Sequence, residues 1–156
     1  MKLIVRAGAV IKSGPERGLI DDYISRASSL ARNLGISAIE EQQIDLRAKK
    51  TRKDQSLAII GETKPGQITV YMDERGKALT SRQMAQQIAR WRDDGHSECV
   101  FLIGPPDGFD RESMPCHALM WQLGKPVWPH KLLRVMLCEQ IYRAFSILAG
   151  TPYHRD

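Results

Sequence analysis

The sequence predicts an α/β domain with a mainly parallel sheet and helices on both faces. Short apolar runs alternate with amphipathic segments along the whole chain, and one run, residues 99–103 (CVFLI), is apolar at every position. A strand that is apolar throughout is typical of the centre of a parallel sheet, because both of its faces are covered. The chain of 156 residues is 42% apolar, without repeats or long linkers, so we expect one domain over residues 1–156.

The first half of the chain predicts two strands, two helices and a basic loop. Apolar and β-branched residues at 3–11 indicate a buried strand. Residues 15–33 place apolar side chains three or four positions apart, as an amphipathic helix does. A looser alternation indicates a second strand at 36–44. A basic loop at 47–53 then precedes a short helix expected at 54–60.

The second half continues the same alternation. Residues 67–73 (QITVYMD) indicate a strand, and Thr80 and Ser81 are expected to cap a helix that continues to Trp91. A sharp turn at 104–108 follows the apolar run. The remaining predictions are a helix at 111–121 interrupted near Pro115, a short strand at 126–128, a helix at 131–148 and a polar tail at 153–156.

Composition excludes several classes of protein. Lys and Arg total 23 against 18 Asp and Glu, and a net charge of +5 permits an acidic partner without identifying one. The three cysteines lack CxxC spacing, which predicts reduced, mostly buried thiols and no metal site. No apolar stretch approaches the ~18 residues of a membrane span, and no signal peptide is recognisable. We therefore expect a cytoplasmic protein with no membrane partner.

The usual nucleotide-binding motifs are absent, since the chain has neither GxGxxG after its first strand nor GxxxxGK[ST]. Two later loops, at 104–108 and 123–128, remain as candidates. Ligands of open α/β sheets bind beyond the carboxyl ends of the strands, and both loops are predicted to lie there. Taken alone, such turns are more often structural than functional.

Four segments resemble motifs of the RlmH family, whose members are SPOUT-class enzymes that methylate N3 of a pseudouridine in 23S ribosomal RNA. They are residues 101–108 (FLIGPPDG), 128–135 (WPHKLLRV), 139–147 (EQIYRAFSI) and 152–156 (PYHRD). The resemblance covers nearly the whole chain and is strongest from residue 99 onward. One departure is Pro105, which stands where the family usually has a second glycine and which removes a backbone N–H.

The resemblance implies a SPOUT fold with a C-terminal trefoil knot, a homodimer, and S-adenosylmethionine (SAM) as the cofactor. It implies that backbone groups of the two late loops hold most of the cofactor. The cofactor-binding residues carried over by motif are Met72, Gly104, Leu123, Gly124, Lys125, Pro126, Val127 and Trp128.

The same resemblance implies that the C-terminal tail and the basic loop contribute to catalysis and to RNA binding. We expect His154, Arg155 and Arg143 to serve catalysis, because histidine is the side chain that titrates near neutral pH and arginines stabilise anions. A phosphate contact for His154 and a structural ion pair for Arg143 are the alternatives. The expected contacts to 23S rRNA are Arg47, Lys49, Lys50, Arg52, Lys53 and Tyr153.

Two other functions remain open from the sequence. The first is a ribosome-binding factor that keeps the fold but does not methylate, and its only support is Pro105. The second is a SPOUT methyltransferase that acts on a different RNA. Binding of SAM distinguishes the first alternative, and a methylation assay on ribosomes against transfer RNA distinguishes the second.

Overall fold

The computed structural model describes residues 1–155, and Asp156, the last residue of the predicted tail, lies outside them. The strands are β1 (Lys2–Gly8), β2 (Ala38–Ile44), β3 (Gln67–Ala78), β4 (Glu98–Ile103) and β5 (Leu119–Gln122). The α-helices are α1 (Pro15–Ala31), α2 (Arg52–Ile60), α3 (Ser81–Asp93) and α4 (His130–Leu148), and two short 3-10 turns are η1 (Arg32–Leu34) and η2 (Arg111–Ser113).

The five strands form one parallel sheet in the order β2-β1-β4-β3-β5. The apolar run 99–103 lies in β4, at the centre of the sheet, and each of its five side chains is fully buried. The predicted α/β class with a parallel sheet is therefore confirmed. The trefoil knot stays a prediction.

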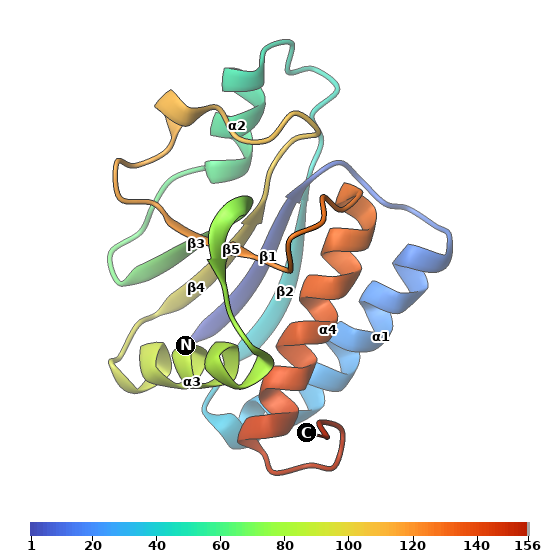
Figure 1. Cartoon of the computed structure of the whole chain (residues 1–156), viewed down its shortest axis with the longest axis vertical. Coiled ribbons are helices and arrows are strands. Elements are labelled where there is room, and N and C mark those ends of the chain that lie inside the picture. Colours follow the sequence, from blue (N-terminus) through green and yellow to red (C-terminus); the bar gives the residue numbers. More distant parts are fainter. Residues whose placement is uncertain (156) are drawn as a thin grey trace.

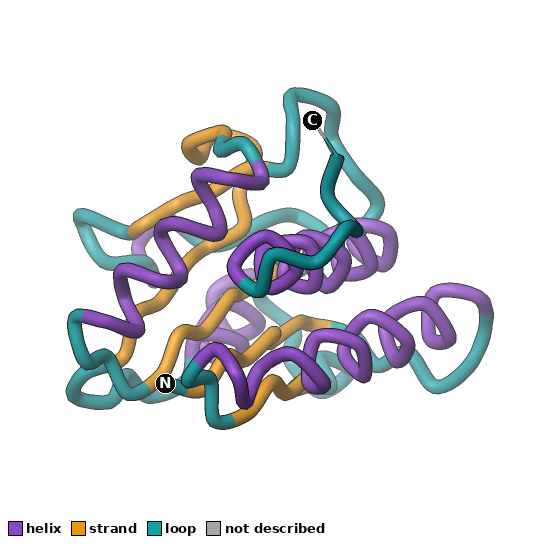
Figure 2. Tube along the Cα trace, turned by 90° about the horizontal axis from the view of Figure 1, so that it is seen from below, coloured by secondary structure: helices purple, strands orange, loops and turns teal. Residues whose placement is uncertain are grey.

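Helices cover the two faces of the sheet unequally (Figures 1 and 2). On one face, α1, α3 and α4 bury a large core that includes Leu3 and Val5 of β1 together with Leu137 of α4. On the other face, α2 and the chain after β4 cover a smaller core around Ile4 and Tyr71. Adjacent residues of β1 thus point into different cores, as the alternation of a strand requires.

Three local predictions are wrong. Residues 111–121 form no helix, because η2 ends before Pro115 and the following apolar residues pair as β5 with β3. Residues 126–128 form a loop and no strand. The first strand ends at Gly8 and not at residue 11, because Ala9 has a φ of 78°, a left-handed conformation that ends the ladder. Short apolar runs do not distinguish helix from strand by periodicity alone.

Strand β3 contains a detour at its carboxyl end. Met72 and Lys77 both pair with Trp121 of β5, so residues 73–76 leave the ladder between them. Gly76 then passes against β5 so closely that a Cβ atom there would lie 2.5 Å from the backbone nitrogen of Trp121. Only glycine fits at this position, and the detour projects Asp73, Glu74 and Arg75 beyond the edge of the sheet.

Arg134 of α4 ties the helix to the ends of two strands. The side chain is 1% exposed, and its Nη2 donates to the carbonyl oxygens of Gly8 and Ala9 at 2.9 Å each. Its Nη1 lies 3.1 Å from the Glu41 carboxylate of β2, which also pairs with Arg17 of α1 at 2.6 Å. Burial lowers the pKa of Arg134, and the nearby Glu41 opposes that effect. The network joins β1, β2, α1 and α4.

The three cysteines are free thiols that differ in their exposure. Cys99 and Cys138 are buried, and burial raises the pKa of the Cys138 thiol to about 12, whereas Cys116 is exposed. Two of the three free thiols are buried, so the expectation of reduced, mostly buried thiols is confirmed, with Cys116 as the exposed one. None of the helices within residues 1–155 is long and apolar enough to cross a membrane.

We predict that Arg134→Ala strongly destabilises the fold. The change leaves Glu41 and two strand-end carbonyls without their buried donor, and breaking a buried pair typically costs about 3–5 kcal/mol. The free energy of unfolding is measured by denaturant titration. The control is Arg26→Ala, which removes an exposed pair with Asp22 and should leave the midpoint near that of the wild type. Equal midpoints for the two variants would contradict the role of Arg134.

Candidate functional site

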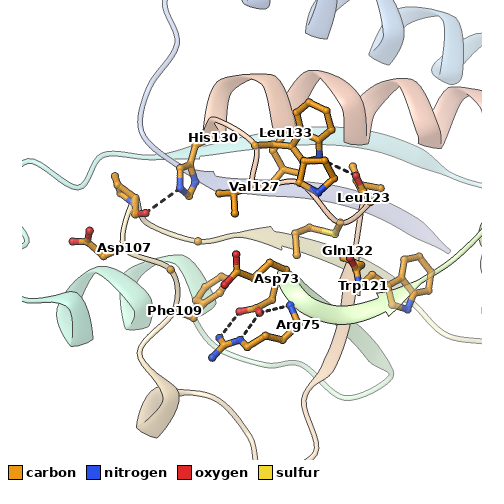
Figure 3. Close-up of a pocket in the computed structure, with 18 of the residues that line it drawn as sticks. Asp73, Arg75, Asp107, Phe109, Trp121, Gln122, Leu123, Val127, His130 and Leu133 are labelled. Atoms are coloured by element: carbon orange, nitrogen blue, oxygen red, sulfur yellow. Dashed lines mark hydrogen bonds and ion pairs between the residues drawn. The ribbon is translucent and has the colours of Figure 1, made fainter.

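A cavity of about 330 Å³ lies beyond the carboxyl ends of β3, β4 and β5 (Figure 3). Its walls come from the end of β3, from the loop after β4 (residues 104–110, the β4 loop), from the loop after β5 (residues 123–129, the β5 loop) and from the start of α4. The size falls within the roughly 300–1,000 Å³ of small-molecule sites. The position matches the ligand sites of open α/β sheets.

The structure brings most of the predicted cofactor residues to this one cavity. Those that line it are Met72, Gly104, Leu123, Gly124, Pro126, Val127 and Trp128. Lys125 belongs to the same loop but does not line the cavity. The Trp128 indole donates to the Leu123 carbonyl oxygen at 2.9 Å, which closes the β5 loop on itself.

The β4 loop is shaped by a ring and a turn. A Cβ atom on Gly104 would lie 3.0 Å from the Phe109 ring, so glycine leaves room for that ring in the cavity wall. The Gly108 N–H donates to the Pro105 carbonyl oxygen at 2.8 Å and closes the turn. Pro105 thus contributes its carbonyl to the loop, and the turn does not require the N–H that proline lacks.

Sequence reasoning missed the polar floor of the cavity. Asp73 accepts hydrogen bonds from the backbone N–H of Arg75 at 3.0 Å and from its guanidinium at 2.7 Å. These bonds lower the pKa of Asp73, so the buried carboxyl stays ionised. Asp73, Glu74 and Arg75 all line the cavity. The signal in the sequence was an Asp at the end of an apolar strand with a Gly three residues later, two residue types that are typical of turns.

His130 lines the cavity at the start of α4. Its Nε2 lies 3.4 Å from the Pro106 carbonyl oxygen, and its Nδ1 is buried with no hydrogen-bond partner within residues 1–155. A buried, unpartnered ring nitrogen is costly unless a ligand or water satisfies it. In addition, Gly124 and Val127 line the cavity, and within residues 1–155 their N–H groups donate to no backbone carbonyl. The cavity thus offers polar groups to a bound molecule.

Two of the predicted catalytic residues, Arg143 and His154, lie together at the other end of α4, whereas Arg155 is exposed. The Arg143 guanidinium pairs with Glu139 at 2.5 Å, and this bond raises the pKa of Arg143. His154 Nδ1 lies 3.4 Å from Arg143 Nη1, and the Tyr153 hydroxyl donates to Glu139 at 3.0 Å. The Tyr153 ring also packs on Tyr142, 4.5 Å between centroids. The start of the tail, residues 153–154, therefore lies against the end of α4 (Figures 1 and 2).

A second, more open groove separates the tail from the cavity. His154 and Gln140 line it on one side, and Leu123 and Gly124 line both the groove and the cavity. The β5 loop therefore stands between the cavity and the tail of the same chain. Arg143 and Arg155 line neither space.

The basic segment, residues 47–53, runs into the start of α2. Arg47 pairs with Asp45 at 2.5 Å, and Lys49, Lys50 and Lys53 are exposed. Arg52 differs from its neighbours because it lines the cavity and donates to carbonyl oxygens of the β4 loop. Among residues 1–155, no group of three or more His, Cys, Asp or Glu side chains is placed to hold a metal ion.

Comparison with known proteins identifies the family. A family model described as "Predicted SPOUT methyltransferase" matches residues 1–154. The chain belongs to the SPOUT methyltransferase family. Among curated relatives, this SPOUT chain is 54% identical over 156 residues to the Ribosomal RNA large subunit methyltransferase H of Maricaulis maris, covering 100% of both chains. Proteins of the same name from Hyphomonas neptunium and Cereibacter sphaeroides are 42% and 40% identical, covering 99% of each chain.

Membership of the SPOUT methyltransferase family implies a methyl donor. The cavity suits a small molecule with an apolar ring and positive charge, because Trp121, Trp128 and Leu133 supply apolar walls and Asp73 supplies a buried carboxylate. The unpartnered His130 nitrogen adds a polar contact that the protein itself leaves unused. The residues present therefore fit a donor of this chemistry.

Proposed function

We propose that this protein transfers a methyl group from SAM to N3 of a pseudouridine in 23S rRNA, acting on the ribosome in the cytoplasm. The observation that carries the proposal is the 54% identity, over the full length of both chains, to a relative named ribosomal RNA large subunit methyltransferase H. The cavity supports it as well, since residues carried over by motif from three separate segments line it together.

We place SAM in the cavity between the β4 and β5 loops. The backbone of residues 123–128, Gly104 and Met72 would hold it, and Trp121 and Trp128 would help to keep water out of the cavity. Asp73, which is paired with Arg75, would supply a carboxylate to a positively charged group of the cofactor. Because the walls are anchored to neighbouring strand ends, the site is largely formed before the cofactor binds.

The chemistry requires an anionic nitrogen beside an electrophilic methyl group, which SAM supplies when bound. N3 of pseudouridine is an imide N–H, and if its pKa lies roughly two units above the working pH, deprotonation costs about 2.7 kcal/mol. Arg143 and Arg155 stabilise the anion, and His154, 3.4 Å from Arg143, accepts the proton. Positioning of the ring beside the methyl group contributes more than either effect.

The basic segment and the tail provide the contacts to rRNA. Arg47, Lys49, Lys50 and Lys53 lie on the surface, and phosphate contacts of this kind orient an enzyme without choosing the base. Tyr153 is partly engaged with α4, and the burial of its hydroxyl and the bond to Glu139 raise its pKa. Tyr153 therefore presents a neutral phenol to the RNA beside Arg143, whose guanidinium lies 4.8 Å from the centroid of its ring.

Gly104→Val is predicted to weaken SAM binding at least tenfold while the protein stays folded. A branched side chain displaces the Phe109 ring, which already lies 3.0 Å from the position of a Cβ, and pushes it into the cavity. Calorimetric titration with SAM measures the effect. Gly18→Ala is the matched control, because nothing lies within 4 Å of a Cβ there and SAM affinity should not change. Unchanged affinity in folded Gly104→Val would place the cofactor elsewhere.

Mass spectrometry of 23S rRNA tests the reaction itself. We expect rRNA from a strain lacking the gene to miss one methyl group on a pseudouridine, and purified protein with SAM to restore it on ribosomes. Transfer RNA should not be methylated. Methylation of transfer RNA alone would favour the SPOUT enzyme with another substrate. Ribosome binding with neither SAM binding nor methylation would favour the non-catalytic ribosome-binding factor.

We further propose that the enzyme is a homodimer whose tail serves the partner's cofactor. The β5 loop separates the tail from the cavity of its own chain. Val127 and Leu132, beside that cavity, are 77% and 44% exposed, and such apolar side chains are typical of a surface that a second copy covers. The helix face at 133–145 gives no support, because Leu137, Ile141 and Phe145 are buried within the chain.

Mixing two inactive variants tests this arrangement. With SAM held well below the weakened affinity of Gly104→Val, that variant and Arg143→Ala should each methylate ribosomes at only a small fraction of the wild-type rate when assayed alone. After mixed refolding, random pairing makes half of the dimers mixed, and one of their two sites is intact, so about a quarter of wild-type activity should return. No recovery, or a monomer in sedimentation at micromolar concentration, would show that each chain forms its own complete site.

A further inference from the structure

We propose that Arg52 is a positioning residue for the β4 loop of the SAM cavity and not a contact to rRNA phosphate. The proposal rests on the proposed function, because it takes the cavity as the SAM site. Arg52 belongs to the basic segment by sequence, but its hydrogen bonds direct it to the loop.

Arg52 holds two consecutive carbonyl groups at the cavity wall. Its Nε donates to the Gly108 oxygen at 3.1 Å, and its Nη2 donates to the Phe109 oxygen at 2.6 Å. The planar fork of a guanidinium can bind two neighbouring acceptors in fixed directions, which a lysine ammonium does not reproduce. The contact therefore fixes the backbone at the residue whose ring packs against Gly104.

A second residue of α2, Ser56, also binds the β4 loop. Ser56, fully buried one turn further along the helix, accepts a hydrogen bond from the Asp110 N–H at 2.8 Å. The Phe109 ring packs edge-on against Tyr71, 5.2 Å between centroids, within the smaller core. From the opposite side, His130 lies 3.4 Å from the Pro106 oxygen. The β4 loop is thus held between α2 and α4, and Arg52 is the outermost attachment on the α2 side.

The neighbouring cation provides a natural comparison. Lys53 is exposed, and within residues 1–155 its ammonium group has no hydrogen bond or ion pair that would hold it in one direction. Arg52 and Lys53 carry the same charge at adjacent positions of one helix. Removal of either charge has the same effect on net charge, and only the loop contacts differ.

The test compares Arg52→Gln with Lys53→Gln in two measurements. Calorimetry without RNA should show SAM binding weakened about 5–20-fold in Arg52→Gln and unchanged in Lys53→Gln. In ribosome binding, the slope of log K against log salt should fall by about one unit for Lys53→Gln and stay unchanged for Arg52→Gln. In turnover, Arg52→Gln should raise KM for SAM and leave KM for ribosomes unchanged. A merely destabilised enzyme would instead lose kcat through a smaller active fraction.

The outcomes separate this inference from the proposed function. If the wild type fails to bind SAM, the proposed function fails. If the wild type binds SAM and Arg52→Gln binds it equally, or if the salt slope of Arg52→Gln falls as much as that of Lys53→Gln, the inference is overturned. Should Arg52→Gln unfold, Arg52→Lys keeps the charge but not the fork, and it should still weaken SAM binding.

Discussion

The position of α4 on the sheet depends on one buried guanidinium. Arg134 donates to the carbonyl oxygens that end β1 and pairs with Glu41 of β2, and these bonds fix where the helix begins. His130 lies one turn earlier, on the same side of the helix, so the anchor also sets the ring that faces the cavity. The same anchor stabilises the left-handed Ala9, whose conformation would otherwise be unfavourable.

The functional site follows from that placement and from the order of the strands. Because β3, β4 and β5 are parallel, their carboxyl ends and the loops that follow meet at one edge of the sheet. One wall is α4, and the opposite support is α2, whose Arg52 and Ser56 bind the β4 loop. Two segments far apart in the sequence thus hold one loop in place, and the loop carries little structure of its own beyond a single turn.

The sequence predicted the parallel sheet, the buried centre at 99–103 and the convergence of the 104 and 123–128 loops, because apolar runs and motif matches carry that information. It did not predict β5, since a run of four residues beside Pro115 has no distinctive period. It also missed Asp73 and the special position of Arg52. Arg52 contacts the backbone of Phe109, which is distant in the sequence, and Asp73 depends on a turn that brings the N–H of Arg75 back to its carboxylate. No local sequence pattern predicts either contact.

The detour in β3 has a consequence for how such a chain can change in evolution. Its two ends, Met72 and Lys77, both pair with Trp121, so the strand resumes where it left off. Residues inserted or deleted between them would alter the floor of the cavity without shifting the register of β3 against β5. Gly76 limits that freedom at one point, because backbone of β5 fills the space of any larger side chain. The residues that form the floor of the cavity can therefore change in evolution while the pairing of β3 with β5 stays the same.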